Sequence, residues 1–288
     1  MVEKSMLNRF IAKLLPHRLW VQVGFLLAWL DPLGLRLHNI CGPVFHCYAC
    51  PLATFACPIG IIAQFSAIHV FPFLAIGTLL LVGGLLGSLI CGWVCPFGLL
   101  QDLAVKAPIK KFHLPQWTGH FRYVILVGTV LLVPYLFGES HPLFVCSICP
   151  AGALEKAVPD VITQAVGGER IVWPNAIKIT IVVVFVAAMF LTIRPWCRVL
   201  CPLGAIFGLL NKVSVLSMRL EDYKCNECKR CHTLCVYGGT PNMDPNDPRC
   251  LRCLECTKCA PGALGVGTIF DSPQEPDQPQ ENEAAESD

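Results

Sequence analysis

The chain has 288 residues, of which 54% are hydrophobic and 15% charged, with a mean hydropathy of +0.57. Soluble domains carry about 25% charged residues, so this composition indicates a protein whose surface lies partly in lipid. The formal net charge is only +2 and there is no basic run, which excludes nucleic acid as a partner.

The chain begins with a basic segment, residues 1–18, that contains Lys4, Arg9, Lys13 and Arg18. The apolar run after it lacks a small-residue cleavage site, so it predicts a first transmembrane helix and no cleaved signal peptide. We expect residues 1–18 to be a cytoplasmic N-terminal segment.

Residues 19–215 are predicted to form a membrane domain. A transmembrane helix needs about 20 residues, with about 17 as the lower limit. Asp31-Pro32 interrupts the first candidate and Pro134 lies within the third. We expect four helices, at Leu19 to Leu37, Phe71 to Ile90, Phe121 to Phe137 and Ala176 to Ile193.

Lysine and arginine are unevenly distributed between the loops. They gather before the first span, between spans two and three, and after span four, whereas the other two loops are poor in them. Because positive residues concentrate on the cytoplasmic side, we expect a multi-pass protein of the cytoplasmic (inner) membrane with both termini in the cytoplasm.

The membrane domain contains an internal repeat of cysteine motifs. In each half a C-x2-C-P precedes a span and a C-x3-C-P follows it, and equivalent positions of the two halves are about one hundred residues apart. The first half holds Cys47, Cys50, Cys91 and Cys95, and the second holds Cys146, Cys149, Cys197 and Cys201.

The segment 216–270 is predicted to be a ferredoxin-like α+β domain with two clusters. Cysteines recur there as C-x2-C-x2-C-x3-C and then C-x2-C-x2-C-x2-C. In such ferredoxins three thiolates of one motif bind a [4Fe-4S] cluster and the other motif supplies the fourth. The expected ligands are Cys225, Cys228, Cys231 and Cys259 for cluster 1, and Cys250, Cys253, Cys256 and Cys235 for cluster 2.

Two details of these motifs depart from the usual pattern. Val236 follows Cys235 where proline is usual, and only two residues separate Cys256 from Cys259. The alternative is zinc, which prefers two separated cysteine pairs in a tetrahedral site. The last residues, 271–288, are acidic and almost without apolar side chains, which predicts a disordered tail.

The cysteines of the membrane domain are expected to lie in two sets, one on each side of the membrane. The sequence C-P-x-G recurs at Cys57, Cys95, Cys149 and Cys201, each time before an apolar run. Proline suits a first helical turn, and the free N–H groups of a helix start favour an anion such as a thiolate-bound cluster. The topology places one set of four on the cytoplasmic side, namely Cys91, Cys95, Cys197 and Cys201.

The outer set would be Cys47, Cys50, Cys146 and Cys149. It is interpreted as a second membrane cluster, as disulfides, or as redox dithiols, because pairs facing an oxidising compartment often form disulfides. Cys41 and Cys57 are left over as substitute ligands, a disulfide or plain thiols. About 30 Å of hydrocarbon separates the two pairs within each half, which disfavours a cluster inside one half.

With these motifs, the chain resembles the membrane ferredoxin family that includes the NapH-type quinol dehydrogenase subunit and the C-terminal part of NosR. The resemblance rests on Cys91 to Pro96, Cys197 to Pro202 and Cys225 to Cys259, and spans roughly residues 18 to 265. It implies about four spans, a cytoplasmic ferredoxin module and [4Fe-4S] clusters. The outer cysteines are additional to the family pattern.

The function expected is electron transfer between the quinone pool or a cytoplasmic donor and another redox protein. The chain would then act as an electron conduit or as the quinol dehydrogenase subunit of a larger oxidoreductase. The alternative is a maturation factor that delivers electrons to thiols or to a metal site. His120 and Arg122 have two interpretations. They contact a quinone headgroup at the inner interface, or they are basic residues that only mark the cytoplasmic side of the membrane. No haem is expected, because the histidines supply no helical pair of axial ligands within the spans.

Overall fold

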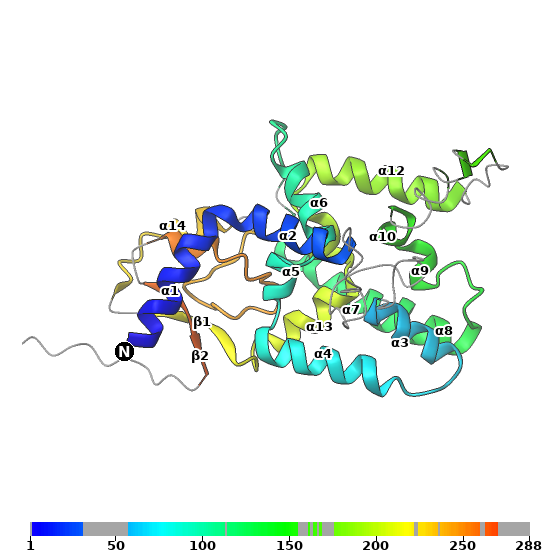
Figure 1. Ribbon diagram of the computed structural model, residues 1–288, viewed down its shortest axis with the longest axis horizontal. Coiled ribbons are helices and arrows are strands. Elements are labelled where there is room, and N and C mark those ends of the chain that lie inside the picture. Colours follow the sequence, from blue (N-terminus) through cyan, green and yellow to red (C-terminus); the bar gives the residue numbers. More distant parts are fainter. Residues whose placement is uncertain are drawn as a thin grey trace, which may run out of the picture.

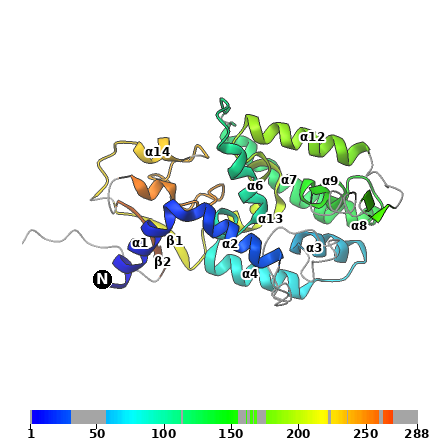
Figure 2. The same ribbon diagram turned by 45° about the horizontal axis from the view of Figure 1, so that its top comes forward.

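The computed structural model describes residues 2–30, 57–112, 114–154, 161, 164–165, 167–168, 176–221, 224–235, 237–259 and 263–269. Most of these residues are helical, and a single two-stranded sheet lies among them. Figure 1 shows the sheet, helix α1 and helix α14 together at one end of the molecule, and the apolar helices at the other. The turned view in Figure 2 shows the same separation.

The N-terminal segment is helical and packs on the sheet. Helix α1 (Val2–Leu14) leads through a 3-10 turn, η1 (Leu15–His17), into α2 (Arg18–Leu30). Asn8 Oδ1 accepts a hydrogen bond of 2.9 Å from the backbone N–H of Val266. Leu15 is buried in the same apolar cluster as Met218. The first predicted span therefore begins as a helix, α2, and its end lies outside the described residues.

The next helices are α3 (Pro58–Ala67), α4 (Phe73–Leu86), α5 (Leu89–Trp93) and α6 (Pro96–Val105). Sequence analysis predicts one continuous span from Phe71 to Ile90, whereas the structure breaks it after Leu86. Gly87 has φ +59° there, and a Cβ at this position would lie 2.5 Å from Arg252 Nη1. The break allows the C-terminal segment to approach the backbone between α4 and α5.

One long apolar helix follows, built from η3 (Gln116–His120), α7 (Phe121–Ile125), the π-helix η4 (Leu126–Leu132) and α8 (Val133–Phe137). Pro134 has no N–H to continue the α-helical ladder, and the turns just before it widen to π geometry. Within the described residues, Trp117–Phe137 is the one helix long and apolar enough to cross a membrane, with 21 residues and a mean hydropathy of 1.6.

The second half contains α9 (Val145–Ile148), α10 (Pro150–Gly152), α12 (Ala176–Leu191), the π-helix η6 (Trp196–Leu200) and α13 (Pro202–Leu210). Helix α12 occupies nearly all of the fourth predicted span. At 16 residues it is slightly shorter than the lower limit of about 17 residues for a span.

The C-terminal segment is framed by two antiparallel strands, β1 (Leu216–Leu220) and β2 (Leu264–Thr268), with Met218 opposite Val266. Between them lie α14 (Arg230–Leu234) and the 3-10 turn η8 (Glu255–Lys258). The buried side chains form two apolar clusters, one within the helices and one under the sheet.

Candidate metal centres

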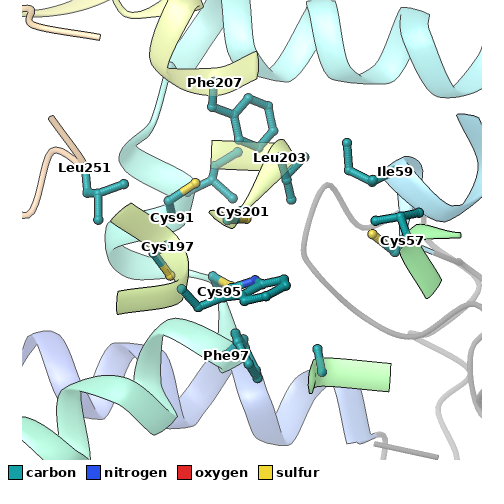
Figure 3. Close-up of a cluster of buried hydrophobic side chains, with 14 of the residues drawn as sticks. Cys57, Ile59, Cys91, Cys95, Phe97, Cys197, Cys201, Leu203, Phe207 and Leu251 are labelled. Carbon is teal, nitrogen blue, oxygen red and sulfur yellow. The ribbon is translucent and has the colours of Figure 1, made fainter. Parts of the chain in front are cut away.

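Four cysteines of the two C-x3-C-P motifs gather inside the helical part. Cys91 lies in α5 and Cys95 just before α6, while Cys197 lies in η6 and Cys201 just before α13. All four are at most 7% exposed, and Figure 3 shows them grouped around a common centre. We call this set the inner quartet.

The two halves build this site with the same local geometry. Cys95 (φ −67°, ψ 118°) and Cys201 (φ −71°, ψ 111°) are extended residues that each precede a helix starting with proline. A Cβ on Gly98 would lie 3.1 Å from the carbonyl oxygen of Cys91, and one on Gly204 would lie 3.3 Å from that of Cys197. The glycine of each C-P-x-G therefore lets the turn close against the first cysteine of its own motif.

The quartet is poorly suited to free thiolates. Burial, and then the neighbouring cysteines, raise the pKa of Cys201 well above its ordinary value, and burial raises that of Cys197 to about 12. Ionising several such thiols together requires a bound cation. N–H donors are in place for the charged form: Gln101 Nε2 donates to Cys197 Sγ at 3.0 Å and the Gly204 amide to Cys201 Sγ at 3.4 Å.

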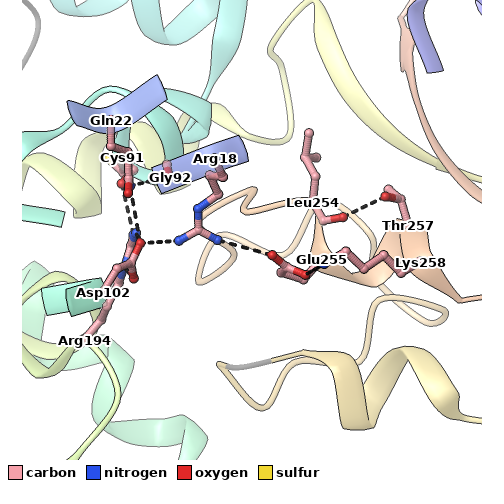
Figure 4. Close-up of polar contacts among 10 residues, drawn as sticks. All are labelled: Arg18, Gln22, Cys91, Gly92, Asp102, Arg194, Leu254, Glu255, Thr257 and Lys258. Atoms are coloured by element: carbon pink, nitrogen blue, oxygen red, sulfur yellow. Dashed lines mark hydrogen bonds and ion pairs between the residues drawn. The ribbon is translucent and has the colours of Figure 1, made fainter. Parts of the chain in front are cut away.

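A buried charge network lies beside the quartet (Figure 4). Arg194, which is fully buried, donates through Nε to Asp102 Oδ1 at 2.6 Å and through Nη1 to the Cys91 carbonyl oxygen at 3.1 Å. Arg18 of α2 forms an ion pair with the same Asp102 and reaches Glu255 Oε1 at 3.9 Å. Asp102 and Glu255 balance the formal charge of the two arginines, and Arg194 is the cation of this network that touches the inner quartet, through the backbone of Cys91.

The predicted ligands of cluster 1 lie together. Cys225, Cys228, Cys231 and Cys259 line one pocket under the sheet, together with Asn242 and Leu264. Burial raises the pKa of the Cys231 thiol, and Cys259 and Cys225 contribute to the same shift, so these thiols are neighbours. Cys259, whose spacing departs from the usual motif, thus lies in the same pocket as the other three.

The predicted ligands of cluster 2 line a second pocket: Cys235, Cys250, Cys253 and Cys256. Backbone amides point at the sulfurs, with Gly239 N donating to Cys235 Sγ at 3.2 Å and Arg252 N to Cys250 Sγ at 3.3 Å. Arg252 (φ +44°) and Leu254 (φ +65°) are left-handed, and such alternation turns successive N–H groups towards an anion. Sequence analysis and geometry give the same grouping for both pockets.

The cluster 2 loop is docked tightly on the helices. The Arg252 side chain, 2% exposed, donates from Nη1 to Ser214 Oγ at 2.8 Å and from Nη2 to the Asn211 carbonyl oxygen at 2.7 Å. Arg122 Nη2 donates to the Pro248 carbonyl oxygen at 2.6 Å. A Cβ on Gly208 would lie only 2.1 Å from that same oxygen. The loop and α13 are therefore in direct backbone contact.

The buried clusters of side chains give the order of the three sites. Cys231 of the first pocket and Cys256 of the second share the apolar cluster under the sheet. Cys253 and Cys235 of the second pocket share the helical cluster with the inner quartet. The second pocket therefore lies between the first pocket and the inner quartet.

The outer set is described only in part. Cys41, Cys47 and Cys50 lie outside the described residues, whereas Cys57, Cys146 and Cys149 are described. Across the described ranges, no three His, Cys, Asp or Glu side chains converge as ligands of a single metal ion.

The proposed quinone contact at Arg122 is explained differently by the structure. Arg122 is 1% exposed and its guanidinium group binds Pro248, as described above. His120 is exposed, and its Nδ1 lies 3.1 Å from the Trp117 carbonyl oxygen. Arg122 is a docking residue for the C-terminal segment, which neither of the two interpretations anticipated.

Sequence reasoning also missed Asp102, Arg194 and Arg252 as parts of the sites. A signal existed for two of them, because Asp102 follows the first C-x3-C-P within one helix and Arg194 lies three residues before the second. Charged residues next to a buried cysteine motif are expected to be paired. For Arg252 the contacts come from distant segments, and its position between two cysteines gives no local signal.

Comparison with known proteins supports the cofactor. The 4Fe-4S binding domain family matches residues 68–115 and 176–221, which are the regions around the two C-x3-C-P motifs. The double match agrees with an internal repeat. No solved structure matches the chain.

The chain is similar to several ferredoxin-type proteins. It is 24% identical to the putative electron transport protein YccM of Escherichia coli, over 60% of this chain and 48% of that protein. It is 26% identical to the ferredoxin-type protein NapH of E. coli, over 51% of this chain and 47% of NapH. It is 31% identical to the regulatory protein NosR of Pseudomonas aeruginosa, over 50% of this chain and 19% of NosR.

The chain spans between about half and three fifths of the length of the first curated relatives that it matches. The matched regions carry the same two motifs that build the inner quartet. In these regions the chain therefore resembles the NapH- and NosR-like ferredoxin-type 4Fe-4S proteins.

Proposed function

We propose that this protein is a membrane-bound electron conduit that passes electrons between the quinone pool or a cytoplasmic donor and a redox partner. The observation that carries the proposal is the grouping of twelve cysteines into three quartets that follow one another through the molecule. A [4Fe-4S] cluster held by four thiolates accepts and releases single electrons. Three such sites in sequence form a path.

The residues around each quartet suit this role. The thiols of the inner quartet are enclosed by apolar side chains, which exclude water, and N–H groups donate to sulfur in the inner quartet and in the second pocket. Hydrogen bonds to sulfur and solvent exposure are the protein's main means of setting a cluster's reduction potential. Because the donors differ between the quartets, we expect the three potentials to differ.

Exposed apolar side chains support the membrane part of the proposal. In α4, Phe73 and Leu74 are 78% and 76% exposed, and in α12, Val183 and Val184 are each 62% exposed. Soluble monomers rarely expose contiguous apolar surface on this scale. Together with the helix Trp117–Phe137, these faces are consistent with contact with lipid.

Reduction by quinol tests the direction of the path. The purified full-length protein, treated without oxygen with a quinol analogue, should show reduced-cluster signals in electron paramagnetic resonance spectra. Cys91→Ser should abolish the inner quartet's signal and serve as the assignment control. Dithionite reduces clusters without quinone chemistry, so signals that appear with dithionite and never with quinol would refute the quinone part and leave a cytoplasmic donor.

A further inference from the structure

A second group of cysteines lies in the helical part, away from the inner quartet. Cys57 precedes α3, and Cys146 and Cys149 lie in and just after α9, which packs against α3. Cys146 and Cys149 pack against the same buried apolar cluster that contains Cys57, so the contact between α3 and α9 brings the three cysteines into one region of the helical part. We call them the outer triad. Figure 3 shows Cys57 apart from the inner quartet, beyond Leu203.

The outer triad repeats the backbone geometry of the inner quartet. Cys57 (φ −47°, ψ 122°) and Cys149 (φ −77°, ψ 118°) are extended and precede Pro-x-Gly helix starts, as Cys95 and Cys201 do. Cys149 and Cys201 are each the N-cap residue of the helix that follows, and of these two only the Cys201 thiol accepts a cap hydrogen bond, from the Gly204 amide at 3.4 Å. Each site thus pairs two C-P-x-G cysteines from different halves of the chain.

The surroundings of the triad are apolar. Cys57 is 8% exposed, and all three cysteines pack with Ile59, Phe144 and Ala151 in the cluster that also contains the inner quartet. Buried thiols in such a setting are neutral and unreactive unless a cation is bound. Soft thiolate ligands select copper(I), zinc or iron–sulfur clusters, and the backbone geometry shared with the inner quartet favours a cluster here too.

We propose that Cys57, Cys146 and Cys149 are protein ligands of a further iron–sulfur cluster, held at the opposite end of the helical core from the ferredoxin-like segment. Three thiolates bind three iron corners of a cubane, as three cysteines of one ferredoxin motif do. Cys57, which spacing alone leaves unassigned, is then a ligand. The role of this cluster as the far terminus of the path rests on the proposed function, whereas its existence does not.

Iron content of full-length protein tests the proposal. Protein purified without oxygen and reconstituted with iron and sulfide should lose about four iron atoms per chain in each of Cys57→Ser, Cys146→Ser and Cys149→Ser. The double variant Cys57→Ser/Cys149→Ser should lose no more than either single variant, because ligands of one cluster act as a unit. The control Ile59→Val, which disturbs the packing of α3 without removing a thiol, should keep its iron.

The outcomes separate this proposal from the proposed function. If Cys57→Ser keeps all its iron while Cys91→Ser loses about four atoms, the triad is not a cluster site and the three-quartet path stands. Mass spectrometry showing Cys146 and Cys149 joined in a disulfide in iron-loaded protein would also overturn the triad. If the wild-type protein binds no iron at all, both proposals fail together.

Discussion

The contact between α13 and the cluster 2 loop predicts that Gly208→Ala will loosen the ferredoxin-like segment. The new Cβ would lie 2.1 Å from the Pro248 carbonyl oxygen and 2.9 Å from Arg122 Nη2. Real Cβ contacts are essentially never shorter than 3.0 Å. The loop must therefore move away from α13, which strains the hydrogen bond from Arg122 to that oxygen.

The cost can be estimated from these contacts. Overpacking costs about 1–3 kcal/mol, and a lost hydrogen bond to a charged group about 1.5–3 kcal/mol. Alanine has a better helix propensity than glycine, which stabilises α13 by about 1 kcal/mol. The net loss of about 3 kcal/mol should raise the population of the undocked loop on the order of 100-fold.

Hydrogen exchange measured by mass spectrometry on the purified full-length protein is the assay. Amides from 247 to 254 should exchange on the order of 100-fold faster in Gly208→Ala. The matched control is Gly84→Ala in α4, where an added Cβ meets nothing within 4 Å. Unchanged exchange in Gly208→Ala, or an equal increase in Gly84→Ala, would refute the docking argument.

Three further predictions concern charge, cluster sharing and topology. Burial alone would raise the pKa of Asp102, but the guanidinium groups of Arg194 and Arg18 hold it below its ordinary value. Asp102→Asn should therefore lower the unfolding free energy by about 3 kcal/mol at pH 7. The difference in unfolding free energy between variant and wild type should narrow as the pH falls below about 4, because the wild-type carboxylate is then protonated. A difference that does not change with pH would contradict this prediction. Cys91→Ser and Cys201→Ser should remove the same paramagnetic signal, and the double variant should add little; separate signals would mean that the pairs are independent. Reporter fusions after Lys111 and Asp288 should report cytoplasm, and one after Gly168 the outside; any reversal would break the proposed sidedness.

The sequence predicts which cysteines of the ferredoxin-like segment lie together, because the two motifs follow the cysteine spacing of two-cluster ferredoxins. The same two sets of four emerge from the motif pattern and from the pockets, including Cys235 and Cys259 with their unusual neighbours. The inner quartet was also predicted from the sequence, because the repeat and the loop charges would put Cys91 and Cys197 on the same side of the membrane. Local motifs and topology are sufficient in both cases.

The rest depends on contacts between distant segments. A lone glycine in an apolar run is no signal for a helix end, so the break at Gly87, which accommodates Arg252, was not predicted. Cys57 has no cysteine at the C-x2-C or C-x3-C spacing, and only the packing of α3 against α9 brings it into the same apolar cluster as Cys146 and Cys149. Arg194 and Asp102 meet across 92 residues; their places beside the cysteine motifs suggest that each is paired, but not that they pair with each other.

A count of distinct reducible clusters tests the central claim most directly. Paramagnetic resonance spectra recorded during a redox titration of the full-length protein should be compared with those of Cys228→Ser, Cys253→Ser and Cys91→Ser. We predict that each variant loses one signal and about four iron atoms, that the three losses are different, and that the other signals persist. If any of these variants keeps every signal, or if two of them lose the same one, the three-quartet path is contradicted.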